Sequence, residues 1–121
     1  MDKKKMKKVT FRFLGRKHVI DQDTTVLGRA HDCEVRIFGE PIYDHLSGHH
    51  CEVFTGFDGP LVRDMDSKKG TYINGERIEG CVSLRDGDQL SLGGIVLMDV
   101  SVKDKGWFGL SSLKSYFGRR R

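Results

Sequence analysis

Three separate segments of this 121-residue chain carry hydrogen-bond donors of the kind that bind a phosphate group. Arg29 offers a guanidinium fork, Ser47 a hydroxyl, and Gly48 a backbone N–H that no side chain obstructs. Lys68 and Lys69 add mobile positive charge from the third segment. A phosphorylated side chain carries about −1.5 to −2 charges and three acceptor oxygens, so binding it requires such donors on a rigid frame. Taken singly, Arg29 also fits an ordinary surface arginine, and Ser47 fits a turn or cap residue.

Histidines and cysteines gather between residues 31 and 51, which raises the questions of a metal site and of nucleophilic catalysis. His45 and His49 are four residues apart, a spacing that joins two ligands on a helix, but the local pattern indicates a loop. There is no Cys-x-x-Cys pair, so zinc is the minor alternative and the sequence predicts no metal and no cofactor. Cys51 follows His50 within an expected strand, where neighbouring side chains point to opposite faces. With no paired carboxylates or nucleotide loop, we expect a protein that is not an enzyme.

Composition and charge narrow the class of protein. The chain is 37% hydrophobic and 31% charged, which is typical of a single globular domain. Residues 1–8 carry a charge of +4 and residues 119–121 carry +3, so the residues between them sum to −3 within the net +4. This distribution argues against a specific nucleic-acid-binding face and leaves weak polyanion contact through the ends as an alternative.

Localisation follows from the cysteines and from the absence of long apolar runs. The three cysteines form no disulfide framework and fit buried thiols in a reducing compartment. We find no apolar run long enough for a transmembrane helix and no secretory signal. The expected place is intracellular, the cytoplasm first and the nucleus as the alternative.

Short alternating segments separated by glycine-rich turns predict an all-β fold. Asn74-Gly75 is the strongest hairpin signal, because both central residues of a type I′ turn need positive φ. We therefore expect an antiparallel β-sandwich of about 10–11 short strands over residues 9–103, after a basic tail at residues 1–8. Residues 104–121 form an aromatic and basic segment whose spacing fits one short helix. That helix either packs on the sandwich, binds a partner or membrane surface, or begins a linker. The segments expected to be strands are Val9–Phe13, Lys17–Ile20, Thr24–Gly28, Glu34–Ile37, His50–Phe54, Leu61–Asp64, Thr71–Ile73, Arg77–Ile78, Gln89–Leu92 and Gly94–Lys103.

The order of three motifs resembles the forkhead-associated (FHA) domain family. That family reads Gly-Arg, then Ser-x-x-His, then Asp-x-x-Ser-x-x-Gly-Thr-x-(aliphatic)-Asn-Gly. The resemblance covers roughly residues 9–103, and each motif alone is weak while the ordered set is specific. The positions that match are Gly28, Arg29, Ser47, His50, Gly70, Thr71, Asn74 and Gly75.

The resemblance implies a role for each matching residue. Loops at one end of the sandwich would bring Arg29, Ser47, Gly48, Lys68 and Lys69 to a phosphopeptide. The same resemblance implies structural support of that site by a second set: a buried His50 that hydrogen-bonds the loops into shape, a turn held by Thr71, and backbone geometry from Gly28, Gly70, Asn74 and Gly75.

The sequence departs from the family pattern at two positions. The family often has arginine after the serine, where this chain has Gly48, so one positive contact is lost. The family also often has asparagine before Gly-Thr, where this chain has Lys69, which lacks the carbonyl acceptor of asparagine. These departures bear on recognition of the peptide backbone more than on the phosphate pocket.

Three functions follow from the sequence. The first is a phosphothreonine-binding adaptor in signalling or assembly, whose partner is a threonine-phosphorylated protein such as a kinase or its substrate. The second keeps the fold as an assembly module that binds proteins without phosphate. The third is polyanion or membrane-surface binding through the basic ends.

Overall fold

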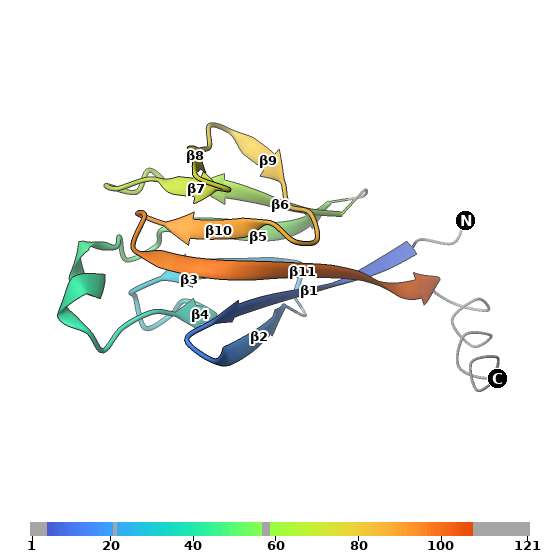
Figure 1. Ribbon diagram of the computed structural model, residues 1–121, viewed down its shortest axis with the longest axis horizontal. Coiled ribbons are helices and arrows are strands. Elements are labelled where there is room, and N and C mark those ends of the chain that lie inside the picture. Colours follow the sequence, from blue (N-terminus) through green and yellow to red (C-terminus); the bar gives the residue numbers. More distant parts are fainter. Residues whose placement is uncertain (1–4, 21, 57–58, 108–121) are drawn as a thin grey trace.

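The computed structural model of the chain describes residues 5–20, 22–56 and 59–107, which form two stacked β-sheets (Figure 1). The strands are β1 (Lys5–Phe13), β2 (Arg16–Ile20), β3 (Thr24–Gly28), β4 (Val35–Arg36), β5 (Cys51–Gly56), β6 (Gly59–Asp64), β7 (Thr71–Ile73), β8 (Glu76–Arg77), β9 (Cys81–Ser83), β10 (Gln89–Leu92) and β11 (Val96–Trp107). One sheet has the order β2-β1-β11-β10-β7-β8 and the other β4-β3-β5-β6-β9. All pairs are antiparallel except β3 with β4. The predicted β-sandwich is confirmed.

The core lies between the two sheets and follows the period-two pattern of the strands. In β1, Val9 and Phe11 are buried while Lys8 and Arg12 are exposed. Burying each large apolar side chain contributes about 1.5–3 kcal/mol, which ties the strands of both sheets together. The side chains that show almost no exposed surface include Val9, Phe11, Leu27, Val53, Val62, Leu90, Leu92 and Met98.

The hairpin turns have the backbone geometry that their residues favour. Asn74 and Gly75 both have positive φ, at 51° and 87°, and join β7 to β8, so the predicted hairpin is confirmed. A second turn joins β1 to β2 at Leu14 and Gly15, with φ of 53° and 72°. Leucine is an unusual residue for positive φ, so the sequence does not indicate Leu14 as a turn residue.

Several elements differ from the sequence prediction. β1 begins at Lys5 instead of Val9, and β11 continues to Trp107, because these two strand ends pair with each other. The short edge strand β9 and the 3-10 helix η1 (Pro41–His45) were not predicted. Of the predicted C-terminal helix, Trp107 belongs to β11, and residues 108–121 lie outside the described residues.

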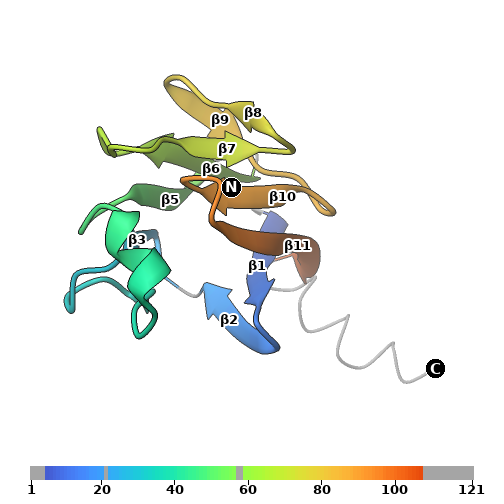
Figure 2. The same cartoon turned by 60° about the vertical axis from the view of Figure 1, so that its left-hand side comes forward.

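The fold gathers three connections at one end. The β3–β4, β4–β5 and β6–β7 connections lie together at the end that carries η1 (Figures 1 and 2). The paired ends of β1 and β11, Lys5 and Trp107, lie at the opposite end. In the described part of the chain, no helix has the length and apolar character needed to cross a membrane.

Candidate functional site

Arg29 follows β3 and is fixed by its own hydrogen bonds. Its Nε donates to the carbonyl of Leu46 at 2.8 Å, and its backbone N–H donates to the carbonyl of Ser47 at 3.2 Å. Its side chain is exposed, and no carboxylate of the described residues forms an ion pair with it. The two terminal amino groups of the guanidinium are therefore held in place and open to a ligand.

Gly28 allows the β3–β4 and β4–β5 connections to meet. A Cβ atom at residue 28 would overlap the carbonyl oxygen of Gly48, so only glycine permits this approach. The carbonyl of Gly48 accepts the backbone N–H of Ala30 at 3.0 Å, next to the bond between Arg29 and Ser47. The close packing of these backbones sets Arg29 beside the Ser47–Gly48 segment.

Ser47 links this segment to the third loop. Its Oγ accepts the backbone N–H of Lys68 at 3.0 Å, which leaves the hydroxyl proton to be donated elsewhere. Lys68 and Lys69 are both exposed, while Ser47 and Gly48 are partly buried. The five residues predicted to contact phosphopeptide thus come from three adjoining loops.

His50 joins two of these loops through hydrogen bonds of its buried ring. Its ring shows no exposed surface; Nε2 lies 2.8 Å from the carbonyl of Gly70, and Nδ1 accepts the backbone N–H of Ser47 at 3.3 Å. Because a carbonyl only accepts, Nε2 carries the proton. Burial lowers the pKa of His50, which favours this neutral form.

Both ring nitrogens of His50 are thus occupied by backbone groups, so the ring is not placed to act as a general base. Burial also raises the pKa of the neighbouring Cys51 to about 12, so its thiol is protonated at neutral pH. A nucleophilic Cys51–His50 pair has no support in this geometry.

The turn after β6 is stabilised by hydrogen bonds to the carboxylate of Asp64. Its Oδ1 accepts the hydroxyls of Ser67 at 2.6 Å and Thr71 at 2.7 Å, and the backbone N–H of Gly70 donates to Ser67 Oγ at 2.9 Å. Burial alone would raise the pKa of Asp64, but the hydrogen bonds from Ser67 and Thr71 outweigh it and lower the pKa. This network shapes the loop that presents Lys68 and Lys69.

Asn74 and Gly75 lie in the hairpin beyond this loop. Asn74 Oδ1 accepts the backbone N–H of Gln89 at 2.9 Å, and its Nδ2 donates to Asp88 at 3.0 Å. Both ends of the amide are used inside the domain. The geometry supports a structural role for Asn74.

Residues 25–93 match the family model of the FHA domain. The chain belongs to the FHA-domain family. FHA domains are binding modules, and the family match spans the three loops described above.

Known proteins share both the sequence and the fold of this FHA domain. The transcriptional regulatory protein EmbR of Mycobacterium tuberculosis is 27% identical over 78 residues, which are 64% of this chain and 19% of EmbR. This chain therefore spans about a fifth of that relative. An FHA-domain structure from work on phosphothreonine-dependent FHA interactions is 25% identical, with a TM-score of 0.68, and the match covers 78% of this chain and 95% of that one. The structure of Mycobacterium tuberculosis EmbR with a low-affinity phosphopeptide is 22% identical, with a TM-score of 0.68, and covers 78% of this chain and 24% of that one.

Sequence reasoning missed one cation of this FHA domain beside the candidate site. Arg36 is exposed on β4, and its Nε donates to the carbonyl of Arg29 at 3.0 Å. Its guanidinium also lies over the ring of Phe38, 4.0 Å from the ring centroid. The parallel pairing of β3 with β4 brings it there, and no local sequence signal indicates such a contact.

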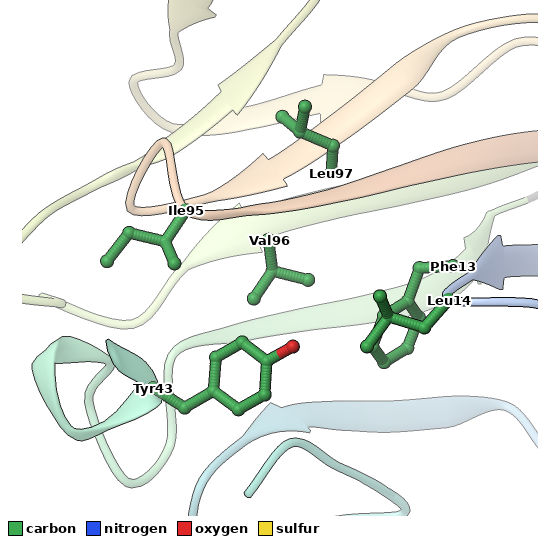
Figure 3. Close-up of a pocket in the computed structure, with 6 residues that line it drawn as sticks. All are labelled: Phe13, Leu14, Tyr43, Ile95, Val96 and Leu97. Carbon is green, nitrogen blue, oxygen red and sulfur yellow. The ribbon is translucent and has the colours of Figure 1, made fainter. Parts of the chain in front are cut away.

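An apolar hollow of about 230 Å³ is separate from the donor set of this FHA domain (Figure 3). The ring of Tyr43, from η1, extends toward Phe13 and Leu14. None of the predicted phosphopeptide contacts lines it. The hollow is lined by Phe13, Leu14, Tyr43, Ile95, Val96 and Leu97.

Proposed function

We propose that this FHA domain is a non-enzymatic adaptor that binds phosphothreonine peptides through its β3–β4, β4–β5 and β6–β7 loops. The observation that carries the proposal is the state of Arg29: Nε is anchored on Leu46, and the terminal amino groups are open. A guanidinium held in this way loses little side-chain entropy when it binds a phosphate. The hydroxyl of Ser47 and the backbone N–H of Gly48 supply further donors next to it.

Family membership supports the same function. The FHA domains of the 25% identical structure are described as phosphothreonine-dependent in their interactions. We assign phosphate contacts to Arg29, Ser47 and Gly48, and peripheral positive charge to Lys68 and Lys69. His50, Gly28, Gly70 and Thr71 act as support for the loops. The partner class is an intracellular protein phosphorylated on threonine.

Titration with three matched peptides tests the proposal. Peptides from a degenerate library would carry phosphothreonine, phosphoserine or unmodified threonine at one fixed position. We expect binding of the phosphothreonine set and at least tenfold weaker binding of the unmodified set. Equal affinity for all three would exclude phosphate recognition.

A second function, phosphate-independent protein assembly, is favoured by Gly48 and Lys69. The first position lacks a charged side chain, and the second presents an exposed lysine where the family often has asparagine. Under this alternative, a partner would bind unmodified, and Arg29→Ala would leave the complex intact.

A further inference from the structure

A cluster of three different ligand types lies beside the candidate phosphate site. Asp32 and Cys33 belong to the β3–β4 connection, and His49 belongs to the segment that precedes β5. One donor atom from each of the three lies within 4.8 Å of the other two. The histidines and cysteines of residues 31–51 raise the question of a metal in the sequence, but their spacing does not indicate this set, because His49 is 17 residues from Asp32 and the two meet only when their loops pack together.

The contacts within the cluster already hold its members near one another. His49 Nε2 lies 2.9 Å and 3.1 Å from the two carboxylate oxygens of Asp32. The Cys33 thiol donates to the carbonyl of Gly48, with its Sγ 3.2 Å from the oxygen. The same carbonyl accepts the backbone N–H of Ala30. Cys33 is buried, whereas His49 and Asp32 are exposed, so one side of the cluster faces the protein interior and the other faces solvent.

This donor set fits zinc better than a hard cation. Imidazole nitrogen, thiolate sulfur and carboxylate oxygen are the three protein ligands of Zn²⁺, whereas magnesium and calcium take oxygen ligands almost exclusively. Bond lengths of about 2.0–2.3 Å around a tetrahedral Zn²⁺ place its ligand atoms about 3.3–3.8 Å apart. Small side-chain movements therefore suffice to bring the three atoms into coordination.

We propose that Asp32, Cys33 and His49 form a Zn²⁺ site, with a water molecule as the fourth ligand on the open side. Binding forms a bond from Cys33 Sγ to zinc, and the thiol proton is released to solvent. His49 binds through a ring nitrogen in its neutral form, and Asp32 binds as the carboxylate. The hydrogen bond from Cys33 to Gly48 is lost in the process.

Zinc at this site would act on the neighbouring loop. With His49 neutral, the empty cluster has a charge of −1, whereas Zn²⁺ with one carboxylate and one thiolate has a charge of 0. The gain of one positive elementary charge beside Ser47 and Gly48 favours the binding of an anionic ligand there. This coupling rests on the proposed phosphopeptide binding, but the metal site does not. We expect zinc to tighten phosphothreonine binding several-fold.

Cobalt(II) offers a direct probe of the metal site without any peptide. Titration of the reduced chain should give one Co²⁺ per chain, with the absorption of a sulfur-to-cobalt bond, and Zn²⁺ should abolish that absorption by displacement. Cys33→Ser and His49→Ala should each weaken metal binding by at least tenfold, consistent with the loss of one of three ligands. Circular dichroism and thermal unfolding would establish that both variants are folded.

Two variants control for metal binding elsewhere. Cys81 is exposed on β9, and His45 is exposed on η1, so Cys81→Ser and His45→Ala should leave the Co²⁺ spectrum and affinity unchanged. A spectrum without the sulfur band, or one lost with Cys81→Ser instead of Cys33→Ser, would overturn the assignment.

The coupling has its own measurement. The phosphopeptide Kd is measured with Zn²⁺ and with a chelator, in the parent chain and in His49→Ala. A several-fold tightening by zinc in the parent alone supports the coupling, and an equal Kd in both conditions overturns it. If no phosphopeptide binds while Co²⁺ still binds, the proposed function fails and the metal site stands.

Discussion

The imidazole of His50 donates from Nε2 to the carbonyl of Gly70 at 2.8 Å while Nδ1 accepts the backbone N–H of Ser47. One buried ring thereby joins the β4–β5 and β6–β7 connections. The bond from Ser47 needs the neutral ring, since protonation of Nδ1 would remove the acceptor that Ser47 requires, whereas either form of the ring can donate from Nε2 to Gly70. The contact of His50 with the loop that carries Ser47 thus depends on the protonation state of the ring.

We therefore expect the free energy of unfolding to decrease as the pH falls below the ordinary His50 pKa of 6.5. Burial lowers the folded-state pKa of His50, so between the two values the unfolded chain binds a proton that the folded chain does not. His50→Gln keeps a donor and an acceptor but does not titrate. In denaturant titrations, the free energy of unfolding of His50→Gln should change less between pH 7.5 and pH 5.5 than that of the parent. The control His45→Gln, at an exposed histidine, should show the same pH dependence as the parent. If His50→Gln showed the same pH dependence as the parent, titratable groups other than His50 would determine the change in stability between pH 7.5 and pH 5.5.

Arg29 should carry most of the phosphate affinity. Arg29→Ala removes a charged donor pair and is expected to cost about 1.5–3 kcal/mol, or roughly 10- to 150-fold in Kd. Arg29→Lys keeps the charge but loses both the guanidinium fork and the Nε hydrogen bond to Leu46. It should therefore recover only a small part of the affinity that Arg29→Ala loses. Calorimetric titration with a phosphothreonine peptide checks both variants. Arg16→Ala, at an exposed arginine of β2, is the control, and a loss there as large as at Arg29 would indicate non-specific charge.

Gly28 and Gly48 make a matched pair for the contact between loops. A Cβ at residue 28 would overlap Gly48, whereas one at residue 48 meets only Ala30 Cβ at an ordinary 3.7 Å. Gly28→Ala should destabilise the domain by about 1–3 kcal/mol and weaken phosphopeptide binding, because the two backbones must separate. Gly48→Ala should change stability by no more than about 0.5 kcal/mol. Chemical denaturation measures both, and equal costs would mean that the close approach is not needed.

The sequence predicted local structure better than contacts between loops. β3, β7 and β10 have the predicted bounds, because turn residues follow each predicted segment or precede it closely. β9 was missed because Cys81-Val-Ser is a short edge segment that pairs with β6, and no local pattern encodes that pairing. η1 depends on i→i+3 bonds such as Tyr43 N–H to Glu40, which propensity alone does not indicate.

The candidate site shows the same division. The motifs predicted which residues carry donors, since Arg, Ser and Lys have the required chemistry whatever their surroundings. The anchor of Arg29 on Leu46, the cation Arg36 and the cluster of Asp32 with His49 come from tertiary packing. None of these contacts has a spacing in the sequence that could be read in advance.

Asn74 allows the scaffold to be separated from the site. Asn74→Ala removes two side-chain hydrogen bonds and places alanine at a φ of 51°, so it should cost about 2–3 kcal/mol. Asn74→Gly loses the same bonds but tolerates the dihedral, and should cost about 1 kcal/mol less. The phosphopeptide Kd of the folded fraction should stay the same in both variants. A change in Kd without a change in stability would instead place Asn74 in the peptide interface.

Gly48 provides a gain-of-function test of where the phosphate lies. The position is partly exposed, and a Cβ atom there would meet only Ala30, at an ordinary contact distance, so a side chain can start from residue 48 without displacing the loop backbone. If the phosphate lies between Arg29 and Ser47, Gly48→Arg adds a second guanidinium and should tighten the phosphothreonine peptide by about tenfold, from the worth of one charge-assisted bond. Gly48→Ala separates this effect from the loss of backbone freedom. Unphosphorylated peptide should gain nothing. Equal tightening of phosphorylated and unphosphorylated peptides would place the bound phosphate away from residue 48 and favour general electrostatic attraction.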